Sequence, residues 1–290
     1  MNNSLLRGIP ALGGMAAALL FSASALAQDA PPNGAPPGLT GEPHDWGLWH
    51  QLSGTPTAER LKEFDQLLTV LMVAIVVLVV LLLGYAVLRF NTRRNPTPRQ
   101  TSHNTVLEVA WTVIPVVILV IIAVPSFKIL FYIDTVPKAD MTLKVIGHQW
   151  YWEYQYPDSG DLDINSYVVN DSDLKPGQKR LLDVDTPVVL PVDTTVRLLI
   201  TGADVIHSWG IPSMGFTRDA VPGRLNETWT RFEQEGTYYG NCRELCGTNH
   251  AFMPVQVKVV SRQEFDQWVQ KTKTAQENTG RAGTQVAQVP

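Results

Sequence analysis

Residues Leu67–Tyr85 form an almost unbroken run of leucine, valine and isoleucine, and no other stretch limits the possible folds as strongly. About 20 apolar residues in a helix cross a hydrocarbon core roughly 30 Å thick. A helix of a soluble protein would normally carry a polar face as well. Thr55 and Pro56 are typical of an N-cap followed by the first helical position, and Glu59 adds negative charge to the first turn. We therefore expect a membrane-spanning helix that begins at Pro56.

A second apolar span extends from Glu108 to Ile133 and contains Pro115 and Pro125. Membrane helices tolerate internal prolines better than exposed helices of soluble proteins do. The two spans together predict a transmembrane helical hairpin over residues 56–133.

The segment that joins the two spans carries Arg93, Arg94 and Arg99 and no acidic residue, which predicts a cytoplasmic loop. Both ends of the chain then lie outside the cytoplasm. Residues 1–27 combine a basic start, an apolar stretch and a closing Ala-Leu-Ala, and this pattern is typical of a secretory signal peptide. A first transmembrane helix is the alternative. Residues 28–55 would form an extracytoplasmic arm, which is rich in Pro and Gly up to residue 43.

Residues 134–271 have the pattern of an exported all-β domain, either a sandwich or a small barrel. The predicted strand segments are rich in β-branched and aromatic residues: Met141–Tyr156, Val184–Pro191, Thr195–Thr201, Thr228–Phe232, Gly236–Tyr239 and Pro254–Val260. A short helix is expected over Arg262–Gln270. The polar composition of residues 272–290 predicts a disordered tail.

Charge and motif content exclude several classes of function. The formal net charge is −4, so no global basic field exists to hold nucleic acid, and the chain has no phosphate-binding GxxxxGK[ST] loop. Only two cysteines are present, Cys242 and Cys246, so disulfides cannot organise the fold.

The two cysteines belong to a dense set of soft metal ligands. Cys242, Cys246, His250 and Met253 lie in one short segment, and thiolate, imidazole and thioether together favour copper. The spacing does not match the Cys-x-x-Cys-His motif that attaches c-type haem. His207 lies at the end of a predicted strand and could reach this loop. A Cys242–Cys246 disulfide and a packed core histidine are the alternatives.

The sequence resembles subunit II of the cytochrome c oxidases of the haem–copper family. The resemblance extends over the helical hairpin and a series of motifs: Gly147-His-Gln-Trp-Tyr-Trp152, Leu190-Pro191, His207-Ser-Trp209, Pro222-Gly-Arg-Leu-Asn226, Tyr238-Tyr-Gly240 and the cysteine loop. It implies a cupredoxin-like Greek-key barrel that holds a binuclear copper A centre.

The resemblance also implies the ligands of that centre. Cys242 and Cys246 would bridge the two coppers; His207 and Met253 would complete one of them, and His250 with the backbone carbonyl of Glu244 the other. The Glu244 side chain would bind magnesium or manganese shared with subunit I, and a carboxylate suits such hard cations. An ordinary surface carboxylate is the alternative for Glu244.

The implied function is that of the subunit through which electrons enter a cytochrome c oxidase. It would accept electrons from cytochrome c and pass them to haem in subunit I, which reduces oxygen to water coupled to proton pumping. Subunit III is a further expected partner. The expected location is a bacterial inner membrane, with the N-terminus and the C-terminal domain on the periplasmic side. A free-standing membrane-anchored copper carrier or an oxidase-assembly chaperone is the alternative function.

The resemblance assigns Trp150 as the residue through which electrons enter, whereas core packing or anchoring at the membrane interface would also explain a tryptophan there. Between Glu153 and Asp204, acidic residues outnumber basic ones by ten to four, which would steer a cationic partner. An ordinary solvated surface is the alternative. The acids that match docking acids of the family are Asp158, Asp161, Asp185 and Asp204.

Glu108 lies at the cytoplasmic end of the second span, where a carboxylate is costly and suggests a function. The resemblance implies the mouth of a proton path into subunit I. Snorkelling to the interface or charge complementarity at a helix N-terminus are the alternatives.

Overall fold

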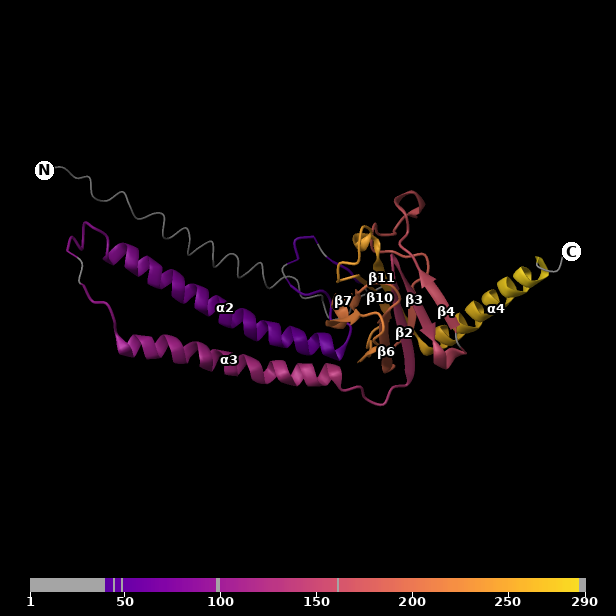
Figure 1. The fold of residues 1–290 in the computed structure, drawn as a ribbon, viewed down its shortest axis with the longest axis horizontal. Coiled ribbons are helices and arrows are strands. Elements are labelled where there is room, and N and C mark those ends of the chain that lie inside the picture. Colours follow the sequence, from indigo (N-terminus) through magenta and orange to yellow (C-terminus); the bar gives the residue numbers. More distant parts are fainter. Residues whose placement is uncertain (1–39, 44, 48, 98–99, 161, 287–290) are drawn as a thin grey trace.

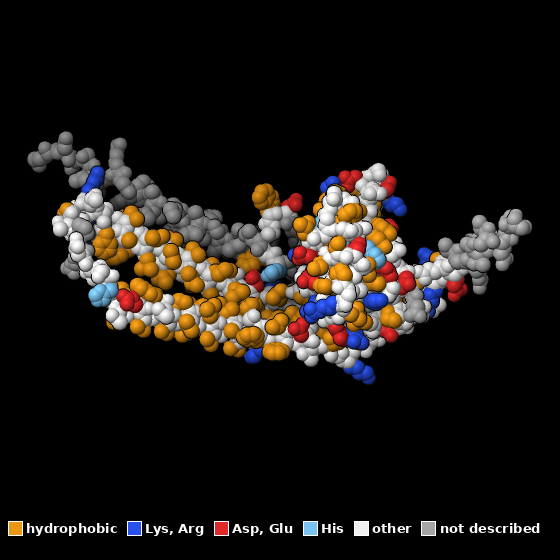
Figure 2. All heavy atoms as spheres, in the orientation of Figure 1, with side chains coloured by type: hydrophobic (Ala, Val, Ile, Leu, Met, Phe, Trp, Pro, Cys, Tyr) orange, Lys and Arg blue, Asp and Glu red, His pale blue; other side chains and the backbone are white. Residues whose placement is uncertain are grey.

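The computed structural model describes residues 40–286, except residues 44, 48, 98, 99 and 161. The predicted signal peptide (1–27) and the first part of the predicted arm lie outside the described residues. Two long helices, α2 (Pro56–Arg89) and α3 (Thr105–Asp134), run side by side in opposite directions (Figure 1). Both are long and apolar enough to cross a membrane. The most apolar stretch of each helix is not covered by other described parts of the chain. Hydrophobic side chains line both helices, while charged ones gather on the β domain (Figure 2).

Local capping explains where the two helices begin. The Thr55 hydroxyl accepts a hydrogen bond from the Ala58 amide, and Pro56 occupies the first turn, as predicted. In α3, the Asn104 side chain caps the helix, so α3 starts before Glu108. The predicted helical hairpin is therefore present, with Pro115 and Pro125 inside α3.

Most of the other described residues form a β domain built from two sheets and a short ribbon. One sheet has the order β1 (Thr40–Gly41), β10 (Gly236–Asn241), β11 (Pro254–Val260) and β5 (Val188–Pro191). The other has the order β4 (Leu162–Ser166), β3 (Tyr151–Tyr156), β2 (Met141–His148), β6 (Val196–Gly202) and β9 (Asn226–Thr230). The ribbon pairs β7 (His207–Ile211) with β8 (Phe216–Ala220). Single-turn 3-10 helices lie in the connections: η1 (Pro157–Ser159), η2 (Asp171–Asp173), η3 (Pro212–Met214) and η4 (His250–Phe252).

Alternation along the strands places one face of each sheet in a common core. In β2, every second residue from Met141 is buried, and β3 buries the alternate residues Trp152, Tyr154 and Tyr156. The same core includes Cys242, Cys246 and Met253. The cysteine loop therefore lies at one edge of the hydrophobic core rather than on a free surface loop.

The strand predictions are only partly matched by the structure. The segment Met141–Tyr156 is a hairpin, because β2 and β3 pair antiparallel around a turn at Gln149-Trp150. Strands β1, β4, β7 and β8 fall outside the predicted strand segments. β4 alternates Leu162 and Ile164 with polar residues over only five positions, so its periodic signal is short.

The C-terminal segment differs from the expectation. Helix α4 (Arg262–Val286) continues through most of residues 272–290, which were predicted as a disordered tail. Its first turns pack Phe265 and Val269 into the core, and Gln276 donates a hydrogen bond to the carbonyl of Asp163. Polar residues such as Gln, Lys and Glu have high helix propensity, so a low hydrophobicity does not exclude a helix that is anchored at one end.

The described part of the arm is tied to the β domain. β1 pairs in parallel with β10. Further along the arm, the Gly54 amide donates to the Ser213 carbonyl at 2.8 Å, and the Thr55 hydroxyl donates to the Met214 carbonyl at 2.8 Å.

The end of α3 is joined to the β domain by side chains of β8 and β9. The last carbonyls of a helix have no partner within the helix. Here the Trp229 indole N–H donates to the Tyr132 carbonyl at 3.0 Å, and Arg218 pairs with Asp134 at 2.5 Å. The Tyr132 ring meets the Trp229 ring edge to face, and the Arg60 guanidinium from α2 lies 3.9 Å from the centre of the Tyr132 ring. One cluster thus connects both helices to the second sheet.

Candidate metal centre

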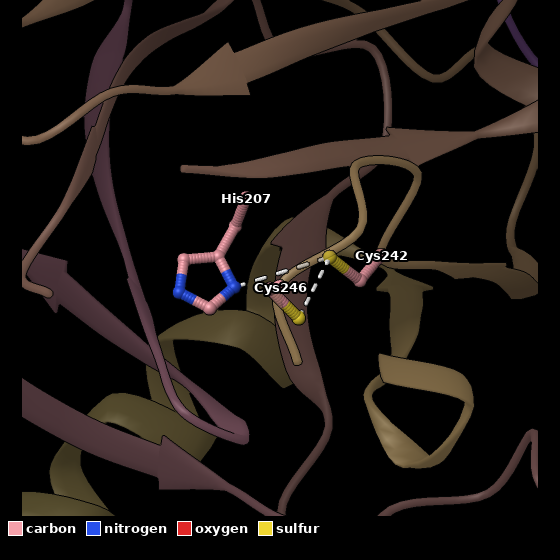
Figure 3. Close-up of side chains that lie close together, drawn as sticks. All are labelled: His207, Cys242 and Cys246. Carbon is pink, nitrogen blue, oxygen red and sulfur yellow. Dashed lines mark hydrogen bonds between the residues drawn. The ribbon is translucent and has the colours of Figure 1, made fainter. Parts of the chain in front are cut away.

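Three side chains from distant parts of the chain meet at one end of the β domain. His207 begins β7, Cys242 directly follows β10, and Cys246 lies four residues further along the same loop (Figure 3). His207 Nδ1 lies 3.9 Å from Cys242 Sγ, and the two sulfur atoms are 3.8 Å apart. All three side chains are buried, and their ligand atoms lie within 4.8 Å of one another.

The two cysteines are not joined by a disulfide. An S–S bond is about 2.05 Å long, whereas these sulfur atoms are separated by 3.8 Å. The arrangement therefore leaves two thiols and one imidazole available as ligands.

Asp204 and Gly147 fix the orientation of the His207 ring. Asp204 Oδ1 lies 2.8 Å from His207 Nε2, which leaves Nδ1 directed toward Cys242. A Cβ atom added at Gly147 would lie 2.8 Å from the imidazole, so only glycine leaves room for the ring in this position. A carboxylate that holds the far nitrogen is the usual arrangement for a metal-binding histidine.

The electrostatics of the cluster favour the charged forms of Asp204 and His207. Partial burial raises the pKa of Asp204, but hydrogen bonds from the His207 ring and from two backbone amides lower it below its ordinary value. Burial lowers the pKa of His207, but hydrogen bonding to Cys242 and Asp204 raises it above its ordinary value.

The two thiols differ in acidity. Burial raises the pKa of Cys242, but hydrogen bonds with His207, with backbone groups and with Cys246 outweigh it and bring the pKa to about 7. Burial and the neighbouring Cys242 raise the pKa of Cys246 to about 12. Two thiolates side by side repel each other, so negative charge on one sulfur raises the pKa of its neighbour.

The other predicted ligands lie around this cluster. His250 Nδ1 is 3.5 Å from Cys246 Sγ, and the Glu244 carbonyl oxygen is 3.3 Å from Cys242 Sγ. Met253 is buried in the same core, and its carbonyl accepts a hydrogen bond from the Cys242 amide. The Glu244 side chain is exposed. Soft sulfur and imidazole donors in a buried pocket fit copper better than a hard cation such as magnesium.

Trp150 lies against the cysteine loop and is half-buried. Its indole N–H donates to the Cys246 carbonyl at 3.3 Å, and the Gln149 side chain donates to the same carbonyl at 2.8 Å. Trp150 is therefore in direct contact with the cysteine loop, as its predicted role in electron entry requires. Gln149 was not among the predicted site residues, because its partner lies 97 positions away and no local pattern reveals it.

The predicted docking acids do not form one group. Asp204 lies next to Trp150, since it accepts a hydrogen bond from the Gln149 amide at 2.7 Å. Asp158 bonds to the Thr142 amide beyond the far end of β3, whose six residues span about 20 Å. Asp185 is exposed and bonds to the backbone of Tyr167. Asp161 lies outside the described residues.

Glu108 lies in the first turn of α3. This end of α3 points away from the β domain (Figure 1). Its carboxylate accepts a hydrogen bond from the Asn104 amide at 3.1 Å, while the Asn104 side chain accepts bonds from Val106 and Leu107. The two side chains cap the helix start reciprocally. The predicted alternative, a role at the helix N-terminus, therefore has structural support.

Two family models match the chain. Residues 43–129 match a model described as cytochrome c oxidase subunit II, transmembrane domain, and residues 141–260 match one described as cytochrome c oxidase subunit II, periplasmic domain. A probable cytochrome c oxidase subunit 2 of Rickettsia felis is 53% identical over 235 residues, which cover 81% of this chain and 75% of the relative. The cytochrome c oxidase subunit 2 of Cereibacter sphaeroides is 42% identical over 253 residues, covering 81% and 83%.

A solved structure also matches the β domain. The periplasmic domain of subunit II of cytochrome oxidase (CoxB) of Bradyrhizobium japonicum is 48% identical and covers 49% of this chain and 99% of that chain, with a TM-score of 0.46.

Proposed function

Because this chain belongs to the cytochrome c oxidase subunit II family, we propose that the cluster of His207, Cys242 and Cys246 is part of the copper A centre that the family implies. The chain is the electron-accepting subunit of a haem–copper oxidase, anchored in a membrane by two helices and carrying a cupredoxin-like periplasmic domain. Another subunit contains the oxygen-reducing site. The observation that carries this assignment is the convergence of two buried thiols and one oriented imidazole.

Each member of the cluster has a distinct role in the proposed centre. Copper bound here would supply a carrier of one electron at a time. Cys242 and Cys246 would hold the copper through their sulfur atoms, and Asp204 keeps the His207 ring turned toward Cys242. His250, Met253 and the Glu244 carbonyl would complete the ligand set.

The exposed Glu244 side chain would bind magnesium or manganese together with subunit I. A carboxylate oxygen is a hard donor, unlike the sulfur atoms beside it, so one loop can serve two different classes of metal.

Electrons from cytochrome c would enter through Trp150. Its hydrogen bond to the Cys246 carbonyl supports this route, because it joins an accessible ring directly to the ligand loop. Asp204 and Asp185 would attract the basic surface of the donor. Asp158 and Asp161 stay predictions as docking acids, and Asp158 lies at the other end of β3.

Subunit I is the partner that would receive the electrons, and subunit III is a further proposed partner. The basic segment between α2 and α3 supports a cytoplasmic loop and a periplasmic β domain in a bacterial inner membrane. Glu108 would then open a proton path from the cytoplasmic side. The family membership does not favour the alternative of a free-standing copper carrier or assembly chaperone.

The test is the copper content and EPR spectrum of the purified full chain after copper loading. Two coppers per chain that share one delocalised electron are expected. A Cys242→Ser variant, which replaces one bridging sulfur, should lose this spectrum. One isolated copper per chain in the unaltered protein would contradict the proposal.

A further inference from the structure

The turn that presents Trp150 is held from two sides. On one side, Gln149 and Trp150 both donate hydrogen bonds to the Cys246 carbonyl. On the other side, His148 and Tyr151 face each other across the strands and close the two-residue turn. The position of the Trp150 ring therefore depends on the pair of His148 and Tyr151, here called the closing pair, as well as on the cysteine loop.

The closing pair is an aromatic stack. The rings of His148 and Tyr151 are nearly parallel, with centres 4.5 Å apart and an interplanar angle of 6°. Tyr151 stacks in turn on Tyr167, at 4.6 Å and 25°. Asp185 fixes Tyr167, because its carboxylate and its amide both bond to the Tyr167 backbone. Aromatic pairs of this kind stabilise a fold beyond the burial of their area, so the stack helps to hold the turn.

Glu153 orients the His148 ring at the other end of the stack. His148 Nε2 donates to Glu153 Oε2 at 2.8 Å, and both side chains are 22% exposed. Glu153 also accepts a hydrogen bond from the Gln155 side chain at 2.6 Å. The carboxylate is thus held from two directions, which restricts the rotation of the imidazole.

We propose that Glu153 and His148 are positioning residues for electron transfer into the cysteine loop: the carboxylate fixes the imidazole, the imidazole fixes the stack that closes the turn, and the turn holds Trp150 against Cys246. This inference rests on the proposed function, in which electrons enter at Trp150. The contacts of both residues lie within the two strands and the turn. They act through the geometry of the turn, where a small displacement of a positioned group lowers a rate.

The experiment measures copper reduction by cytochrome c in the assembled oxidase by stopped flow. Glu153→Ala should slow this step by about threefold to tenfold. Copper content and the copper spectrum should stay unchanged, and so should the rate with a small dye reductant that needs no docking surface. His148→Ala should slow the step by a similar factor. The double variant should be no slower than either single variant, because both act through one contact.

Two further variants separate positioning from charge. Glu153→Gln keeps an oxygen that can accept the bond from His148, so it should restore most of the wild-type rate. Glu227→Ala removes an acid of the same sheet that pairs with Arg197 in β6, and it should leave the rate unchanged. Slowing by Glu227→Ala equal to that by Glu153→Ala would mean that only the lost negative charge matters, and would overturn the proposal.

Trp150→Ala distinguishes failure of this inference from failure of the proposed function. Slow reduction in Trp150→Ala with a wild-type rate in Glu153→Ala would refute the positioning role alone. A wild-type rate in Trp150→Ala would refute the route through Trp150 and this inference with it. Loss of copper from Glu153→Ala would likewise overturn the proposal, because Glu153 would then support the ligand loop itself.

Discussion

At the residue scale, the Asp204 side chain can both hold the His207 ring and attract a basic partner. Its Oδ1 lies against the His207 ring and its Oδ2 accepts the Gln149 amide, so both oxygens are engaged in the site. Its side chain is still 35% exposed, which leaves it accessible to a basic partner. The hydrogen bonds of Asp185 go to the backbone of Tyr167 instead. The two acids therefore allow metal support and docking to be separated.

We expect Asp204→Asn to lower copper affinity by about 10- to 100-fold, because loss of a carboxylate partner weakens a metal-binding histidine. The measurement is copper retention during dialysis against a chelator, with Asp185→Asn as the matched control. Asp185→Asn should retain copper like the wild type, because Asp185 bonds to Tyr167 and not to His207, and its effect should be confined to reduction by cytochrome c. Equal copper retention in both variants would mean that Asp204 does not support His207.

At the scale of elements, α3 shows that a polar residue in an apolar span can have a local structural role. Glu108 and Asn104 cap the helix start, and a lost cap costs about 0.5–2 kcal/mol. A capping role and a proton-path role predict different results for two substitutions. Glutamine can still accept the Asn104 bond, whereas alanine cannot.

We expect Glu108→Gln and Glu108→Ala to slow oxidase turnover alike, since neither side chain can carry a proton as a carboxylate does. Copper reduction by cytochrome c should stay at the wild-type rate in both variants. Steady-state oxygen consumption and stopped-flow reduction measure the two steps. If glutamine supports wild-type turnover and alanine does not, the function of Glu108 is to cap α3.

At the scale of the whole molecule, the hairpin and the β domain are connected through the end of α3. The cluster of Arg60, Tyr132 and Trp229 includes residues of α2, α3 and β9, and Arg218 of β8 adds an ion pair with Asp134. β9 belongs to the same sheet as β2, which leads to the Trp150 turn. The membrane anchor and the sheet that bears the turn are therefore in direct contact.

We expect Trp229→Phe to lower the free energy of unfolding of the β domain by about 0.5–1.5 kcal/mol in the full chain, because the hydrogen bond to Tyr132 is lost. In a fragment that begins at residue 135, Tyr132 is absent and this contribution should vanish. Thermal unfolding followed by near-UV circular dichroism measures both. Trp268→Phe, in α4, should have the same effect in both proteins. An identical loss for Trp229→Phe in the two proteins would contradict a role for the junction.

The amino-acid sequence alone determined the helical hairpin and the soft ligand set, because hydropathy and the spacing of Cys242, Cys246, His250 and Met253 are properties of neighbouring residues. The same local reasoning predicted the start of the C-terminal helix at Arg262 but not its continuation to Val286, because the polar composition after residue 271 resembles that of a disordered tail.

Only the tertiary structure decided which residues meet. His207 reaches Cys242 across 35 positions, Gln149 reaches Cys246 across 97, and Asp158 lies at the opposite end of β3 from Trp150. These contacts depend on strand register and on the packing of two sheets, in which a shift of one residue would turn every side chain to the opposite face. No short stretch of sequence carries that information, and so the contacts of Asp204 with His207 and of Glu153 with His148 emerged only from the fold.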